Sequence, residues 1–129
     1  MIILTVDEIL AIHKRLASET GGSPELRDIG LLESAVYAAD ASFGGEEIYP
    51  TAKEKAARLA YSLISNHPFV DGNKRIGVFT MLMTLRLNNV KISYTQKELS
   101  DTVIDIASGK MSYEDILAWI EAHLCDTVA

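Results

Sequence analysis

Apolar residues recur every three or four positions along most of the chain, which is the spacing that places them on one face of an α-helix. Four such segments begin with a capping box, in which a Ser or Thr precedes an acidic residue by three positions. The pairs are Thr5 with Glu8, Thr51 with Glu54, Thr95 with Glu98, and Ser112 with Asp115. The pattern predicts a first helix at about residues 6–18 and a second that begins after Asp28. It predicts a third helix from after Thr51 to about residue 66, and three more at about residues 73–88, 96–108 and 113–124. The expected fold class is therefore all-α, with six helices.

The helix expected at about residues 73–88 is apolar on nearly every side. Its middle reads IGVFTMLMTL, which leaves almost no polar face. A helix of this kind is normally buried among other helices. We therefore expect a six-helix bundle arranged around this buried central helix.

Residues 43–50 are the stretch that does not read as a helix. Gly44 and Gly45 interrupt it, and Pro50 pushes the preceding residue towards extended geometry. We expect a loop or a short hairpin here, and a second short extended piece at residues 90–94.

Composition indicates one soluble domain, residues 1–129, because 48% of the residues are hydrophobic and nothing suggests a second core. The formal net charge of −6 argues against direct binding of nucleic acid, which relies on Lys and Arg to neutralise phosphates. Cys125 is the only cysteine, so an internal disulfide is excluded and a reducing cytoplasm fits. The apolar start MIILTV lacks a basic leader, and the apolar segment 76–87 is too short to cross a membrane. The expectation is a cytoplasmic protein with no membrane contact, as a monomer or weak oligomer.

A short stretch near the middle of the chain, HPFVDGNKR, concentrates the candidate chemistry. His67 opens it, and a histidine can accept a proton near neutral pH. Asp71 offers the carboxylate oxygens that Mg²⁺ prefers. Phe69 is apolar within a polar loop and is expected to anchor that loop in the core.

The second half of the same stretch is suited to binding an anion. Gly72 and Asn73 favour a tight turn into a helix. Lys74 and Arg75 add two positive charges where the N–H groups of a helix start already attract anions. Taken singly, each residue has a common structural explanation, such as capping or solvation. Their combination at the start of a buried helix favours a phosphate-handling site.

The stretch resembles the signature of the Fic superfamily, HxFx(D/E)GNxxR, and is most similar to its Doc (death-on-curing) branch. Lys74 stands where members that transfer AMP carry glycine, and Val78 stands where the longer motif has a second arginine. The segments 21–35, 44–57 and 85–92 also resemble the family, so the likeness extends over most of the chain.

The resemblance implies an ATP- and Mg²⁺-dependent enzyme with a Fic/Doc-like fold, and it assigns a role to each residue of the loop. His67 would take the proton from a protein hydroxyl, and Asp71 would hold Mg²⁺ against the nucleotide phosphates. The backbone N–H groups of Gly72, Asn73 and Lys74 would line an anion hole, and Arg75 would bind phosphate oxygens.

By the same resemblance, the non-helical stretch would be a flap that docks the target segment by strand-like pairing. The residues concerned are Gly45, Glu46, Glu47, Ile48 and Tyr49. From the pattern alone, a plain surface connection explains them equally well.

The function implied is that of a Doc-like toxin, which transfers the γ-phosphate of ATP to a translation factor, elongation factor Tu, and halts translation. AMP transfer to a protein hydroxyl and an inactive antitoxin-binding module are the alternatives. The inhibitory pattern (S/T)xxxE(G/N) of many Fic proteins is absent from this sequence, so restraint is expected from a Phd-like antitoxin in trans. For His13 and His123 we expect structural or surface roles, and for Arg27 and Asp28 a local ion pair.

Overall fold

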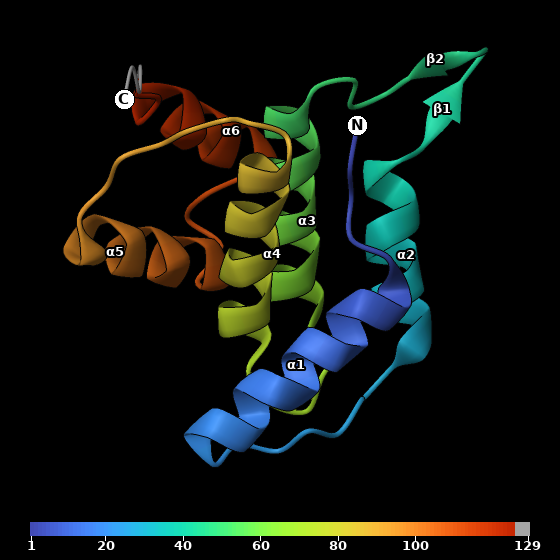
Figure 1. Ribbon diagram of the computed structural model, residues 1–129, viewed down its shortest axis with the longest axis vertical. Coiled ribbons are helices and arrows are strands. Elements are labelled where there is room, and N and C mark those ends of the chain that lie inside the picture. Colours follow the sequence, from blue (N-terminus) through green and yellow to red (C-terminus); the bar gives the residue numbers. More distant parts are fainter. Residues whose placement is uncertain (126–129) are drawn as a thin grey trace.

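The computed structural model describes residues 1–125, and this part of the chain forms an all-α fold with one small hairpin (Figure 1). The helices are α1 (Val6–Thr20), α2 (Ile29–Ala39), α3 (Ala52–Asn66), α4 (Asn73–Leu87), α5 (Gln96–Ala107) and α6 (Tyr113–Ala122). The hairpin joins β1 (Ser42–Phe43) to β2 (Glu46–Glu47) in antiparallel register. The expected all-α class is confirmed, and the non-helical stretch is a hairpin and not an irregular loop.

Two antiparallel helices, α3 and α4, form the centre of the molecule (Figure 1). The central place expected for α4 is therefore shared with α3, which is the more buried of the two. Their close approach depends on small residues, because a Cβ on Gly77 of α4 would lie 2.5 Å from Cγ1 of Ile64 on α3. Substitution of Gly77 would thus require the buried Ile64 side chain or the helices themselves to shift.

Apolar side chains gather on both sides of this central pair. On one side, α5 and α6 pack against α3 and α4 around Ile106, Ile116 and Ile120. On the other side, α1 and α2 contribute Ile9 and Leu32 to a second cluster that also holds Phe69. The second cluster thus reaches the loop between α3 and α4.

Side-chain caps begin the helices much as the sequence indicates. The boxes at Thr5, Thr95 and Ser112 are complete. At Thr51 the cap is present but the box is not reciprocal, because Glu54 accepts from the Thr51 hydroxyl at 2.8 Å. The segment after α4 is extended at one position, where Ile92 forms an isolated bridge with Leu124. None of the helices in residues 1–125 has the length and hydropathy needed to span a bilayer.

Candidate active site

The loop between α3 and α4 begins with a strained residue that another part of the chain holds in place. His67 follows the last residue of α3 and adopts a left-handed conformation with φ of 52°, which is uncommon outside glycine. The guanidinium of Arg27 donates to the carbonyl of His67 at 2.6 Å and to that of Asn66 at 2.8 Å. Arg27 therefore caps the end of α3 with charge-assisted hydrogen bonds.

This geometry corrects the local ion pair expected between Arg27 and Asp28. Asp28 instead caps α2, where its carboxylate accepts from the N–H of Leu31 at 3.2 Å. The two side chains serve different helix ends, because Arg27 turns to the carbonyls that α3 leaves unpaired.

An extended segment lies beside the loop and pairs with it. Leu26 and Phe69 form an isolated antiparallel bridge. The N–H of Arg27 donates to the Pro68 carbonyl at 2.8 Å, and the N–H of Val70 donates to the Glu25 carbonyl at 3.1 Å. The connection from α1 to α2 is therefore the neighbour of the loop.

Asn73 and Phe69 fix the interior of the loop. The Asn73 side chain accepts from the Phe69 N–H and donates to the Phe69 carbonyl, both at 2.9 Å. The Phe69 ring is 1% exposed and stacks on His13, with ring centroids 3.6 Å apart. Phe69 therefore lies in the core, and Asn73 holds its backbone from the first turn of α4.

His13 is a site-supporting residue whose role the sequence did not reveal. It is 2% exposed on α1, and its Nε2 lies 2.7 Å from the carbonyl oxygen of Asp71. The only signal in the sequence is its position on the apolar face of its helix, together with Ile9. That face predicts burial but does not identify a partner 58 residues away.

Asp71 and Gly72 lead into α4 through a turn that needs glycine. Gly72 is the N-cap with φ of 77°, and its N–H donates to Oδ1 of Asp71 at 2.8 Å. The first helical bond runs from the Ile76 N–H to the Gly72 carbonyl. By helix geometry, the N–H groups of residues 73–75 lie ahead of that bond and point out of the helix start. The Gly72 N–H expected in the anion hole is thus engaged by Asp71, whereas those of Asn73 and Lys74 lie where an anion would approach.

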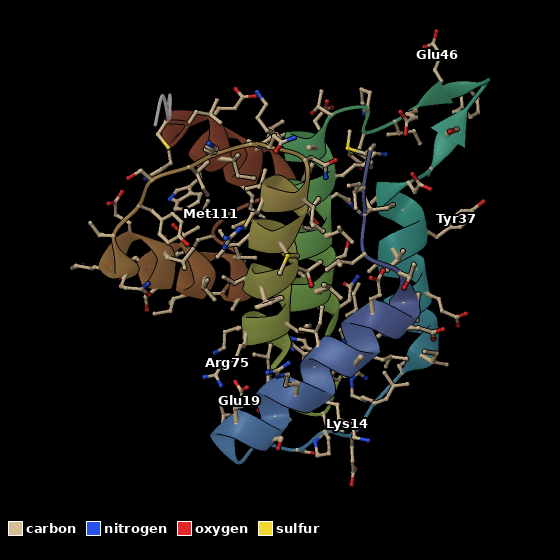
Figure 2. The ribbon with its side chains drawn as sticks, in the orientation of Figure 1. Lys14, Glu19, Tyr37, Glu46, Arg75 and Met111 are labelled. Atoms are coloured by element: carbon tan, nitrogen blue, oxygen red, sulfur yellow. The ribbon has the colours of Figure 1, made fainter. Side chains whose placement is uncertain are left out.

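A cavity of about 840 Å³ opens at this helix start. Its polar end includes Asp71, Lys74 and Arg75, and the end of α1 closes one side. Figure 2 labels Arg75 at the lower end of α4, in the same corner of the view as Glu19 near the end of α1. The apolar wall comes from α4 and α5, with Val78, Phe79, Leu82, Leu99, Val103 and Ile104. A volume of this size and lining suits a small molecule with an anionic group at one end.

His67 is exposed and is not among the described residues that line this cavity, although it belongs to the same loop. Its Nδ1 lies 3.4 Å from Nδ2 of Asn73. A contact of this length is at the limit of a hydrogen bond and does not fix the ring tautomer. The imidazole therefore remains accessible to a group arriving from solvent.

The residues around Asp71 fit a magnesium ion that arrives with a nucleotide. Within residues 1–125 there is no group of three or more His, Cys, Asp or Glu side chains that could hold a metal ion. Mg²⁺ is commonly bound by one or two carboxylates together with substrate phosphates. Asp71 supplies one carboxylate at the polar end of the cavity, next to the N–H groups that would face those phosphates.

The hairpin expected to act as a flap lies far from this loop. It precedes α3, whose 15 residues rise about 22 Å before His67. Figure 1 shows the hairpin at one end of α3 and the loop at the other, and Figure 2 places Glu46 at the top right and Arg75 near the lower end of α4. The loop residues His67 to Arg75 are thus gathered at one end of the bundle, and Gly45 to Tyr49 at the other.

Comparisons with known proteins bear on the same residues. The sequence profile of the Fic/DOC family matches residues 3–85, which include the whole loop. The chain is 35% identical over 106 residues to Toxin Doc of Mycolicibacterium smegmatis, an overlap that covers 82% of this chain and 72% of that protein. It is 29% identical over 113 residues to Protein kinase doc of Escherichia phage P1, covering 88% of each chain.

Proposed function

This chain belongs to the Fic/DOC family, and from that premise we propose that it is a Doc-like toxin. The reaction we propose is transfer of the γ-phosphate of ATP to a hydroxyl group of a translation factor, with elongation factor Tu as the target. Its relatives named Toxin Doc and Protein kinase doc support a toxin that modifies proteins.

The observation that carries the proposal is the cavity at the start of α4. Two cationic side chains, Lys74 and Arg75, and the N–H groups of residues 73–75 converge on its polar end. A helix start of this kind binds phosphate groups through its N–H groups and its dipole. The apolar wall between α4 and α5 would accept the base of the nucleotide.

In the proposed reaction, His67 removes the proton from the target hydroxyl. The hydroxyl oxygen forms a bond to the γ-phosphorus, and the bond from this phosphorus to the bridging oxygen breaks, which leaves ADP. Arg75 binds phosphate oxygens in a bidentate manner, and Lys74 offsets the charge that develops on the leaving group. Mg²⁺ held by Asp71 would neutralise phosphate charge when bound.

The target would approach from the solvent side of the loop, where His67 is exposed. Leu26 and Val70 are exposed beside it, at 38% and 54%. The segment 25–28 already pairs with the loop through backbone hydrogen bonds, so it is better placed than the hairpin to guide an extended target segment.

An antitoxin supplied in trans completes the proposal. Its helical segment would lay an apolar face against the wall formed by α4 and α5, and thereby compete with the nucleotide.

The test is transfer of radiolabel to a purified translation factor or to bacterial lysate. We expect label from γ-labelled ATP and none from α-labelled ATP. His67→Ala should lose at least about 100-fold in rate, because general base catalysis contributes 10² to 10⁴. Tyr37→Ala, at an exposed residue of α2 outside the loop, is the control and should retain activity. Transfer of α-label by the wild-type protein would instead establish AMP transfer, and absence of any transfer would favour an inactive binding module.

A further inference from the structure

The α1 helix and the residues just after it approach Asp71 in two places, and neither is used by the chemistry above. One is the hydrogen bond from His13 to the Asp71 carbonyl. The other is the approach of Gly22, just after α1, to the Asp71 carboxylate. We propose that His13 and Gly22 are positioning residues that set where the carboxylate of Asp71 sits, and thereby the strength of Mg²⁺-dependent nucleotide binding. The inference rests on the proposed role of Asp71.

His13 holds the backbone of Asp71. Its Nε2 N–H donates to the Asp71 carbonyl at 2.7 Å, whereas its buried Nδ1 has no hydrogen-bond partner among the described residues. A buried polar nitrogen without a partner is unfavourable, so packing alone would be served better by an apolar ring. The stacked contact with Phe69 keeps the imidazole from rotating. His13 therefore directs one N–H at one carbonyl of the site.

Gly22 leaves open the space that the Asp71 carboxylate occupies. A Cβ at Gly22 would lie 2.8 Å from Oδ2 of Asp71, which is closer than carbon and oxygen can approach without displacement. The backbone there is fixed, because the N–H groups of Gly21 and Gly22 both donate to the Ala17 carbonyl. Oδ1 of Asp71 is held by the Gly72 N–H. Together these contacts hold the carboxylate in the space that a side chain at residue 22 would occupy.

The left-handed residue in this turn is Gly21, with φ of 75°, so an L-residue at position 22 meets no comparable backbone strain. Gly22→Ala should therefore fold, and the flexible Asp71 side chain should move in response. This makes the substitution a selective way to displace one carboxylate.

The experiment measures the dissociation constant of ATP by isothermal titration calorimetry, with Mg²⁺ and with EDTA. We expect Gly22→Ala to weaken Mg²⁺–ATP binding by about tenfold, which corresponds to about 1.4 kcal/mol. Binding in EDTA should be unchanged, and so should the melting temperature. Gly30→Ala is the matched control, because its Cβ would crowd another carboxylate, that of Asp28 at 3.1 Å, away from the cavity.

A double-mutant cycle decides whether the effect passes through Asp71. In an Asp71→Ala background, Gly22→Ala should cause no further loss, because no carboxylate is left to displace. His13→Phe, which keeps a stacked ring but removes the donor, should also weaken binding only when Mg²⁺ is present. Equal loss in EDTA, loss that persists without Asp71, wild-type affinity in Gly22→Ala, or failure of that variant to fold would each overturn the proposal. Nucleotide binding with these properties but without phosphate transfer would leave the inference intact and refute the proposed function.

Discussion

We propose that Lys74 is the residue that separates phosphate transfer from AMP transfer. It occupies the first turn of α4, is exposed, and lines the polar end of the cavity. Glycine at this position would let a phosphate approach the backbone closely because it has no Cβ. In the proposed reaction, the long charged side chain would remove that room and favour a pose that brings the terminal phosphate towards His67.

We therefore expect Lys74→Gly to reduce transfer from γ-labelled ATP and to permit some transfer from α-labelled ATP. Lys74→Ala is the matched variant, since it removes the charge but keeps a Cβ and good helix propensity. It should lose γ-transfer without gaining α-transfer. If Lys74→Gly transfers the γ-phosphate at the wild-type rate, Lys74 does not determine the choice of phosphate.

Among the elements, α5 and α6 are joined by a histidine held between two acceptors. His123 Nε2 lies 2.6 Å from Oε2 of Glu98, and its Nδ1 lies 2.7 Å from the Trp119 carbonyl. The hydrogen bond to the Trp119 carbonyl, and after it the bond to Glu98, raise the pKa of His123 above 6.5. The hydrogen bond from His123 lowers the pKa of Glu98 below 4.5. Both nitrogens donate only when the ring is protonated.

The pair should stabilise the fold most between about pH 4.5 and 6.5, which are the unperturbed pKa values of Glu98 and His123. The contribution of His123 is complete below 6.5 and disappears as pH rises through its raised pKa. That of Glu98 is complete above 4.5 and disappears as pH falls through its lowered pKa. The melting temperature of wild type minus that of His123→Gln should be largest in this window and smaller at pH 9. A difference that does not vary with pH would contradict the charged pair.

The hairpin is fastened to α3 by a buried lysine. Lys55 is fully buried, and its Nζ donates to the Ala39 carbonyl at 3.1 Å and to Oε1 of Glu47 at 2.9 Å. Asp40 accepts at 3.4 Å. The charge of Lys55 is thus compensated by two carboxylates that remain partly open to water.

Lys55→Met should lower the free energy of unfolding by about 1–3 kcal/mol, because it removes hydrogen bonds to charged partners but keeps most of the buried volume. Urea denaturation provides the measurement. Lys53→Met, two residues earlier on α3, should change stability little, since Lys53 is partly exposed and lies 3.9 Å from its partner Glu121. Equal effects of the two substitutions would show that the buried network does not hold the hairpin.

For the molecule as a whole, the proposed function predicts toxicity without a partner. The cavity at the α4 start opens to one side of the bundle, and no described segment of the chain occupies it with an inhibitory glutamate. Expression of the wild-type protein should therefore arrest bacterial growth, and co-expression of an antitoxin should relieve the arrest. The His67→Ala variant, expressed at the same level, is the control and should be tolerated. Harmless expression of folded wild-type protein would favour an inactive binding module.

The helices and the local shape of the loop could be predicted because local rules determine them. Apolar spacing and N-cap residues place five helices within about two residues of their observed ends, and they place the start of the helix after Asp28, which ends at Ala39. The turn at Gly72 follows from its conformational freedom, and the burial of Phe69 follows from its apolar ring in a polar stretch. Each of these depends on residues that are close together in the sequence.

Contacts between distant residues could not be predicted in this way. His13 is 58 residues from Asp71, and Arg27 is 40 residues from His67. The local pattern is compatible with a structural or surface role for His13 and with a local ion pair for Arg27. Their actual hydrogen-bond partners come within reach only when the helices pack. The same packing put the hairpin at the far end of α3 and a lysine in the core. The sequence by itself determined the helices and placed the candidate site residues in one loop, because capping and periodicity act over a few residues. Only the tertiary structure decided which side chains hold Asp71 and His67 in place, because that depends on where α1 and the segment after it come to lie against the loop.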